Sequence, residues 1–269
     1  MDELARYNQE RWNALVDAGI QFSRPIYDLD VARARTLIDP NGVIHKMLGD
    51  AANRAVLCLA GGGGQQSAAF ALLGAQVTVL DLSPRQLEQD RMAAAHYGLE
   101  MEIQQGDMRN LTRFADDSFD IVFQPYSINF VPDVNEVFAG VRRILRQGGL
   151  YRLEFGNPLA IPLDERHWNG SGYPLNRPYR DGEIVLDEVG WDVADEEGQV
   201  QIVEGPREFM HTLGTVLTGL ATHGFRLLGL WEFIEADPNP PPGTWQHYTQ
   251  VCPPWYSVWL QLDRNSLAL

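Results

Sequence analysis

The chain has 269 residues, 45% of them hydrophobic, and a formal net charge of −15 at pH 7. This size and hydrophobic content allow one large α/β domain, with or without an insert. The negative charge repels polyanions and so argues against nucleic acid and anionic membrane surfaces as partners. The two cysteines, Cys58 and Cys252, provide neither a disulfide framework nor a metal cluster, which favours a reducing compartment.

Residues 1–50 are predicted to form two helical segments. Apolar residues of the first segment recur near a 3.6-residue period, and a second segment over residues 29–37 ends before Pro40. The N-terminus shows no apolar core of a signal peptide, and the longest apolar stretch, residues 68–80, is too short to span a bilayer. We therefore expect a cytoplasmic protein.

The central feature of the sequence is an apolar run that breaks into four glycines, Gly61 to Gly64, and resumes as a helix of small residues. This order predicts a buried strand, a tight turn and a helix N-terminus in a βαβ unit. Glycines let the backbone approach a ligand closely, and the free N–H groups at the helix start point toward it. Asp81 ends the next predicted strand, residues 76–81, where a carboxylate can accept both hydroxyls of a ribose.

The spacing of the glycines discriminates among nucleotides. A dinucleotide site needs a Gly or Ala three residues after G-x-G, but Gln66 and Ser67 occupy that place in the two possible registers. No Lys-Ser or Lys-Thr pair follows the glycines, so the pattern of a phosphate-binding P-loop fails as well. An NAD-dependent oxidoreductase is therefore a disfavoured alternative.

The segment after Asp81 carries strong helix signals. Ser83 is a suitable N-cap, and Pro84 fits the first helical position. Gln86 is placed to complete a capping box, and Gly98 can adopt the left-handed conformation at the helix end. The sequence therefore predicts a helix from Pro84 to Gly98.

Further strands follow this helix. Residues 101–105 form a short predicted strand that ends before Asp107, and residues 118–123 form a fourth strand. In an open α/β sheet the loop after the fourth strand, residues 124–133, lies over the switch point where ligands bind. The next predicted features are an amphipathic helix over residues 136–146, the pair Gly148-Gly149 and a fifth strand over residues 150–155.

Residues 56–64 carry a resemblance to a known enzyme family. They resemble motif I, V-L-D-L-G-C-G-T-G, of the class I S-adenosylmethionine-dependent methyltransferases. Cys58 stands where the family usually has Asp, and Ala60 stands in place of the first Gly.

Four further landmarks follow in the family's order. Asp81 matches the acid that binds the ribose in this family. Asp107 and Met108 match an acid that bonds the adenine amino group and an apolar residue that lies against the ring. The remaining landmarks are Phe119-Asp120 and Gly148-Gly149. Together the five landmarks cover residues 56–155, and their combination is far more specific than any one of them.

The resemblance implies a Rossmann-like α/β fold. Its sheet would have seven strands, mostly parallel with the last strand antiparallel, with helices on both faces and a small inserted cap. The cofactor would be S-adenosyl-L-methionine, and the product S-adenosyl-L-homocysteine. The residues expected to bind the cofactor are Ala60, Gly61, Gly62, Gly63, Gln65, Asp81, Leu82, Asp107, Met108, Gln124, Pro125 and Tyr126.

We expect one methyltransferase domain over residues 1–269. By the resemblance, residues 1–50 would form a helical lid over the cofactor, and a helix packed at the sheet edge fits equally well. Residues 157–206 are rich in Pro, Gly, Trp and Tyr and predict an inserted cap whose hairpin pairs residues 183–189 with 199–204. The other expected units are a cofactor-binding half at 51–156 and, within 207–269, a helix over 207–224 and two strands over 225–235 and 255–262.

Methyl transfer from a sulfonium mainly requires that the acceptor be aligned with the methyl group and that water be excluded. A dedicated base is optional. Tyr126, His167 and His211 are weak candidates for that role, since such groups can take a proton from an acceptor. His211 falls on a predicted amphipathic helix, where a packed histidine is the commoner case. The histidines show no metal-ligand spacing, so we expect no metal site.

The expected acceptor is a small molecule, apolar or aromatic, because the aromatic insert suits an enclosed pocket. Oxygen, nitrogen, carbon and sulfur acceptors all stay open, as does the oligomeric state. The alternative from another class is a non-catalytic protein that binds S-adenosylmethionine or a nucleotide. Such a protein would keep Asp81 and the glycines while its acceptor pocket is blocked.

Overall fold

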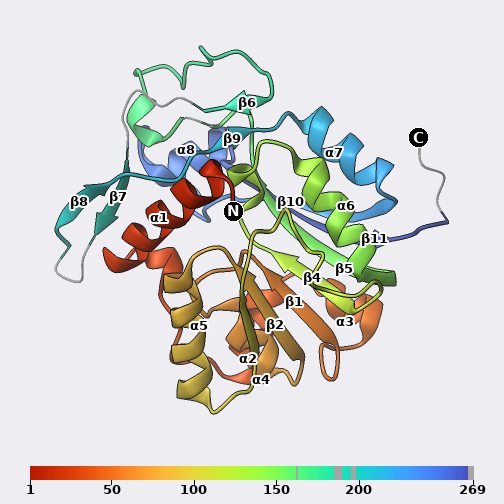
Figure 1. Ribbon diagram of the computed structural model, residues 1–269. Helices are drawn as coiled ribbons and strands as arrows, with labels where there is room; N and C mark the ends of the chain where they lie inside the picture. The colour runs from red at the N-terminus through yellow and green to blue at the C-terminus, as the bar shows by residue number, and fades with distance from the viewer. Residues whose placement is uncertain (162, 185–189, 195–197, 266–269) are drawn as a thin grey trace.

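The computed structural model describes residues 1–161, 163–184, 190–194 and 198–265 (Figure 1). The strands of its central sheet are β1 (Ala55–Leu59), β2 (Gln76–Asp81), β3 (Glu102–Gln105), β4 (Phe119–Gln124), β5 (Leu145–Gly156), β10 (Phe225–Glu232) and β11 (Trp255–Leu262). Their order is β10-β11-β5-β4-β1-β2-β3. Strands β1 to β5 pair in parallel, whereas β11 runs antiparallel to both of its neighbours. The predicted sheet, mostly parallel with an antiparallel last strand, is confirmed.

Helices cover both faces of the sheet, as predicted. One face carries α2 (Val31–Ile38), α3 (Val43–Leu48), α4 (Gln66–Leu72) and α5 (Pro84–Tyr97), and the other carries α6 (Val134–Ile144) and α7 (Leu213–Thr222) (Figure 1). Side chains of β1 alternate between two cores, with Leu57 and Leu59 on the α6–α7 side. Val56 and Cys58 pack on the opposite side. A strand covered on both faces must be apolar throughout, which explains the unbroken apolar run.

Helix α5 begins and ends close to the predicted residues, but its start differs in one bond. The Ser83 hydroxyl accepts from the Gln86 N–H at 3.1 Å, and Gly98 has φ +64° after the last turn. The Gln86 side chain does not return to the Ser83 N–H as a capping box requires. It donates to the Ser23 hydroxyl at 2.7 Å, while the Ser83 N–H donates to Asp81 Oδ1 at 2.8 Å. The tertiary contact with Ser23 takes the place of the local one.

A set of segments from distant parts of the chain lies over one end of the sheet, at the top and upper left of Figure 1. We call this set the roof. It consists of α1 (Glu3–Asp17), η1 (Gln21–Ser23), the hairpin β7 (Trp191–Ala194) and β8 (Val200–Val203), the pair β6 (Gly182–Glu183) and β9 (Phe209–Met210), η3 (Glu165–His167) and α8 (Trp245–Val251).

Buried Asn8 joins α1 to the rest of the roof and to the sheet. Its Nδ2 donates to the Phe130 carbonyl at 3.3 Å, and its Oδ1 accepts from the Arg207 N–H at 2.9 Å. Phe130 belongs to η2 (Ile128–Phe130), the short helix after β4. Helix α1 is therefore tied both to the loop beyond β4 and to the segment before β9.

The hairpin of the cap has a different first arm from the predicted one. Strand β7 pairs with β8, so the first arm begins at Trp191. The predicted first arm, residues 183–189, begins within β6. Residues 185–189 of this arm and residues 195–197 of the predicted turn lie outside the described residues. Alternating polarity alone did not show which of two neighbouring stretches pairs with β8.

The predicted helix over residues 207–224 is wrong in its first six residues. Phe209 and Met210 form β9, and α7 begins only at Leu213. The apolar spacing suits a helix, but pairing with β6 overrides this local preference. His211 accordingly lies between β9 and α7 and not on a helix.

Other helix and strand boundaries differ from the predicted ones by five residues or fewer. Helix α6 ends at Ile144 and β5 starts at Leu145, five residues earlier than predicted. Strand β10 ends at Glu232, three residues earlier than predicted. Helix α8 lies in a stretch for which we predicted no element, and the Thr244 hydroxyl caps it by accepting from the His247 N–H. Within the described part of the chain, no helix is long and apolar enough to cross a membrane.

Candidate active site

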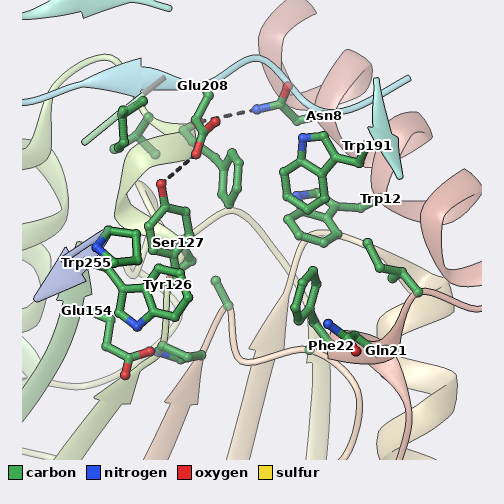
Figure 2. Close-up of a pocket in the computed structure, with 18 of the residues that line it drawn as sticks. Asn8, Trp12, Gln21, Phe22, Tyr126, Ser127, Glu154, Trp191, Glu208 and Trp255 are labelled. Atoms are coloured by element: carbon green, nitrogen blue, oxygen red, sulfur yellow. Dashed lines mark hydrogen bonds between the residues drawn. The ribbon is translucent and has the colours of Figure 1, made fainter. Parts of the chain in front are cut away.

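A cavity of about 1750 Å³ lies between the carboxyl ends of β1 to β4 and the roof (Figure 2). Pockets that hold one drug-sized ligand usually measure roughly 300–1,000 Å³. This cavity therefore has room for two molecules side by side. Its lower part is formed by the loops that follow the parallel strands, which we call the floor, and its upper part by the roof.

The glycine-rich turn forms part of the floor. Gly63 and Gly64 have φ of +85° and +69°, and a Cβ at either would lie within 2.8 Å of the Ser23 backbone or the Gln89 carbonyl. Only glycine fits there. At Gly61, which lines the cavity, the nearest atom to such a Cβ would be the Cys58 Cβ at 3.6 Å, an ordinary contact distance.

Asp81 lies beside this turn at the end of β2. Its carboxylate accepts from the Ser83 N–H at 2.8 Å and from the N–H groups of Gly62 and Leu82. Burial raises the pKa of Asp81 to about 6, and the three N–H donors oppose that shift. The carboxyl group lines the cavity, so it can accept hydrogen bonds from a ligand there.

Gln86 also lines the cavity, next to Gly62. Its Nε2 is bound to Ser23, whereas its buried Oε1 has no hydrogen-bond partner among the described residues. A buried acceptor without a partner is costly unless a ligand supplies a donor. The Gly61 backbone at the cavity wall, the Asp81 carboxyl and this amide oxygen together fit the hydroxyl-bearing part of a nucleoside.

Asp107 and Met108 line the next part of the floor, after β3. The Asp107 carboxylate is held by Arg109, with Nη2 2.6 Å from Oδ2. Arg109 also pairs with Asp2, the N-cap of α1, with Nη1 2.9 Å from Oδ2, and this hydrogen bond helps to lower the pKa of Asp2 to about 2. The arginine thereby links the floor to the start of α1.

Gly63 and Gln124 do not line the cavity, unlike the other ten residues expected to bind the cofactor. Gln124 is fully buried below it. Its Oε1 accepts from the Tyr151 hydroxyl at 2.5 Å, and its Nε2 donates to the Ser127 hydroxyl at 3.0 Å. Gln124 therefore supports the loop beyond β4 from behind.

The three candidate bases have different surroundings. His211 is buried away from the cavity, with Nε2 3.0 Å from the Val131 carbonyl, and burial lowers its pKa. His167 lines the cavity in η3, where its Nδ1 is 2.9 Å from Asp164 Oδ1. Tyr126 lines the cavity and donates its hydroxyl hydrogen to Glu208 Oε1 at 2.7 Å.

Aromatic rings surround the upper part of the cavity (Figure 2). The Trp12 ring meets Phe130 and Trp191 edge-on, at centroid distances of 5.2 and 5.5 Å. On the opposite wall, Tyr126 lies 6.0 Å from Phe130 and 6.4 Å from Trp255. These five rings come from α1, β7, the loop beyond β4 and β11, and they enclose one apolar space.

Two carboxylates face the same space, and their surroundings differ. Glu154 on β5 is paired with Arg152 at 2.5 Å and accepts from the Ser257 hydroxyl at 2.7 Å. For Glu208 the structure gives one side-chain hydrogen bond, the one from Tyr126. Burial raises the pKa of Glu208, and burial together with the Glu208 charge raises the pKa of Tyr126 well above its ordinary value.

Asn8, Glu154 and Glu208 were not among the site residues predicted from the sequence. Glu154 had a usable signal, since it is a charged residue within the apolar end of β5. Glu208 had none, because it precedes two apolar residues in a stretch with helical spacing. Its place in the cavity depends on the pairing of β9 with β6, which no local pattern predicts.

The chain is similar to known proteins over most of its length. Residues 57–153 match the model of a methyltransferase domain. The uncharacterized methyltransferase YbaJ of Bacillus subtilis is 30% identical over 241 residues, which cover 86% of this chain and 91% of that protein. A malonyl-[acyl-carrier protein] O-methyltransferase of Xylella fastidiosa is 32% identical over 135 residues, 49% of this chain and 45% of the relative.

Solved structures share the fold. An S-adenosylmethionine-dependent methyltransferase from Mesorhizobium loti has a TM-score of 0.57 at 20% identity, with 88% of this chain and 100% of that chain covered. Geranyl diphosphate C-methyltransferase from Streptomyces coelicolor, in complex with S-adenosyl-L-homocysteine, Mg²⁺ and geranyl diphosphate, has a TM-score of 0.60 at 13% identity. That comparison covers 97% of this chain and 99% of the other.

Proposed function

This chain belongs to the class I S-adenosylmethionine-dependent methyltransferases, and on that premise we propose that it methylates a small, apolar or aromatic molecule. The observation that supports this proposal is the continuity of the cavity. The floor, with Asp81 and the glycines, opens directly into the space enclosed by aromatic rings. The volume of about 1750 Å³ is sufficient for a cofactor and a second small molecule.

We assign the cofactor to the floor. Asp81 would accept hydrogen bonds from the ribose hydroxyls, and the backbone of Gly61 and Gly62 would lie against the ligand. Met108 would lie against the adenine ring, with Asp107 near its amino group. When bound, S-adenosylmethionine supplies an activated methyl group on a sulfonium sulfur.

The roof would then align the acceptor and exclude water. Aligning two reactants can lower a barrier by about 7–11 kcal/mol, so a protein that only positions the acceptor already accounts for much of the catalysis. Trp12 and Trp191 would cover the acceptor from the side of α1 and the hairpin. In this division, residues 1–50 and 157–206 form the lid and cap, and residues 51–156 hold the cofactor.

Two measurements test the proposal. Titration calorimetry should show S-adenosyl-L-homocysteine binding with a Kd near micromolar, about −8 kcal/mol, and no binding of NADH. Transfer of labelled methyl from S-adenosylmethionine is then followed with small aromatic alcohols, amines, thiols and acids, and with protein and RNA as controls. Transfer to protein or RNA alone would contradict the small-molecule assignment, and NADH binding alone would contradict the cofactor assignment.

A further inference from the structure

Resting on the proposed function, we propose that the methyl acceptor is an amine, which binds as its ammonium ion beside Glu208 within the aromatic rings. We also assign to Glu208 the proton that the amine must lose before it can be methylated.

The first observation is the position of Glu208. It directly precedes β9, and in Figure 2 its carboxylate lies above the space between Tyr126 on one side and Trp12 and Trp191 on the other. Tyr126 donates to Oε1 at 2.7 Å. Among the described residues, no Arg, Lys or His forms an ion pair with Glu208, and burial raises its pKa without any opposing cation.

The second observation is the contrast with three other acids that line the cavity. Glu154 is paired with Arg152, Asp107 with Arg109, and Asp164 with Arg166. A carboxylate withdrawn from water is unfavourable unless a positive charge and hydrogen bonds compensate it. Glu208 has one neutral donor in place of a cation, so a positively charged ligand would complete this part of the cavity.

The third observation is the set of aromatic rings that line the same part of the cavity as the Glu208 carboxylate. Phe130 lies 6.0 Å from Tyr126 and 5.2 Å from Trp12, and Trp191 lies 6.3 Å from Phe130, all as centroid distances. Faces of Trp, Tyr and Phe attract a cation within about 6 Å, and desolvation strengthens this attraction. Rings around a carboxylate suit an organic ammonium better than an alcohol or an anion.

The chemistry balances with the groups at hand. The ammonium gives one proton to Glu208, which yields a neutral amine and a protonated carboxyl group. Burial favours the neutral carboxyl, so the transfer is easier than to an exposed glutamate. The nitrogen lone pair forms a C–N bond to the methyl carbon as the C–S bond breaks and its electron pair stays on sulfur. The products are the methylated ammonium ion and S-adenosylhomocysteine, and Glu208 later releases its proton to water.

Tyr126 is a positioning residue in this scheme. Its hydroxyl has a strongly raised pKa and stays protonated, so it donates to Glu208 and leaves the other carboxylate oxygen for the ligand. Replacing it by Phe keeps the ring and removes only this hydrogen bond.

The test uses three probes with similar skeletons and different charges: 2-phenylethylamine, 2-phenylethanol and phenylacetate. Each is titrated by calorimetry into the full chain saturated with S-adenosylhomocysteine at neutral pH. We expect the amine to bind about tenfold or more tightly than the alcohol, and phenylacetate to bind most weakly. Equal binding of the three, binding of none, or a preference for the alcohol or the acid would overturn the inference.

Glu208→Gln and Glu154→Gln are the matched variants. Glu208→Gln should weaken amine binding about tenfold or more and change alcohol binding less than about threefold, because only the ammonium needs the charge. Glu154→Gln should weaken amine binding much less, since Arg152 already compensates that carboxylate. Equal losses in both variants would overturn the assignment of Glu208. If Glu208→Gln does not fold, the inference is tested by the ranking of the three probes on the unaltered chain and by the Tyr126→Phe variant. Tyr126→Phe should reduce the preference for the amine over the alcohol.

The two proposals fail in different ways. Absence of S-adenosylhomocysteine binding contradicts the proposed function itself. Binding of S-adenosylhomocysteine with methyl transfer to 2-phenylethanol and not to 2-phenylethylamine leaves the function standing and overturns the amine inference.

Discussion

The floor and the roof of the cavity are built in opposite ways. The floor comes mainly from one continuous stretch, in which β1, the glycine turn, α4, β2 and α5 follow one another between residues 55 and 97. The roof brings together Asn8, Trp12, Trp191 and Glu208, which are separated by up to 200 residues. The floor, made of local motifs, suits the cofactor that the family shares. The roof is made of distant segments, so single substitutions there can change which acceptor it binds.

The two regions also differ in how they are held. Around the floor, the β1 side chains Val56, Leu57 and Leu59 are completely buried. Helix α1 meets the cap through a small apolar cluster, in which Leu15 packs with Val193, and through polar contacts at its surface. There Tyr7 and Arg11 both bind Glu204, at 2.6 and 2.5 Å. Exposed pairs of this kind contribute little free energy. The roof is therefore the region where changes should alter acceptor binding without unfolding the floor.

Replacing residues 191–203 by two glycines should give the largest effect. Trp191 and Val203 are paired across the hairpin, so the ends that remain lie close enough for a short linker. Loss of Trp191 and Ile202 from the cavity should reduce methyl transfer about 100-fold or more, while the Kd for S-adenosylhomocysteine stays within about threefold.

Calorimetry and a methyl-transfer assay check this separation of the two regions. Val200→Ser is the control, because Val200 is 63% exposed on the hairpin and does not line the cavity. A folded deletion variant that loses S-adenosylhomocysteine binding would show that the cap belongs to the cofactor site.

The pH dependence of stability tests a feature of the floor. Asp90 on α5 lies under the glycine turn, where it accepts from the Ser67 hydroxyl at 2.5 Å, and burial raises its pKa to about 7. Because the pKa of Asp90 is higher in the folded than in the unfolded chain, protonation of this carboxyl group favours the folded state. This contribution to stability is complete below the unfolded pKa and is lost as pH rises through the folded pKa. Between about pH 5 and pH 8, Asp90 should therefore remove about 3 kcal/mol from the free energy of unfolding.

Denaturant unfolding of the unaltered chain and of Asp90→Asn, at several pH values, measures this change. Asparagine does not titrate, so the free energy of unfolding of the unaltered chain relative to the variant should fall as pH rises. A difference that is constant across this range would contradict the raised pKa.

Asp81→Ala should weaken S-adenosylhomocysteine binding by roughly 1.5–3 kcal/mol, because ligand hydroxyls would lose their buried acceptor. Asp107→Ala is the comparison within the same floor. Its carboxylate is already held by Arg109, so its removal should weaken binding less. Calorimetry measures S-adenosylhomocysteine binding to both variants. An unchanged Kd in a folded Asp81→Ala protein would assign a purely structural role to Asp81.

The same contrast explains what could be predicted from the sequence. Strand β2 has the predicted bounds, and α5 ends one residue from its predicted end, because caps, glycines and apolar runs are local signals. The placement of Glu208 and Asn8 could not be predicted. Asn8 is held by Phe130 and Arg207, which are 122 and 199 residues away in the sequence. Long-range contacts of this kind leave no periodic pattern along the chain.

Ala60→Gly should give the smallest effect, and it tests how strongly the floor constrains its own backbone. Ala60 stands where the family motif has glycine, and it adopts φ +48° while its N–H donates to the Leu80 carbonyl at 2.7 Å. The left-handed region costs a residue with a Cβ roughly 1–2 kcal/mol. Glycine removes this strain and adds about 0.5–1 kcal/mol of backbone entropy loss on folding.

The net expectation is a gain of about 0.5 kcal/mol in the free energy of unfolding, measured by urea denaturation. Ala95→Gly in the exposed part of α5 is the matched control, because the same substitution at a helical φ should lose about 1 kcal/mol. Opposite signs for one substitution at two sites would separate strain in the turn from the general effect of glycine. Equal losses at both sites would mean that hydrogen bonding of the turn, and not its left-handed φ, determines the stability at Ala60.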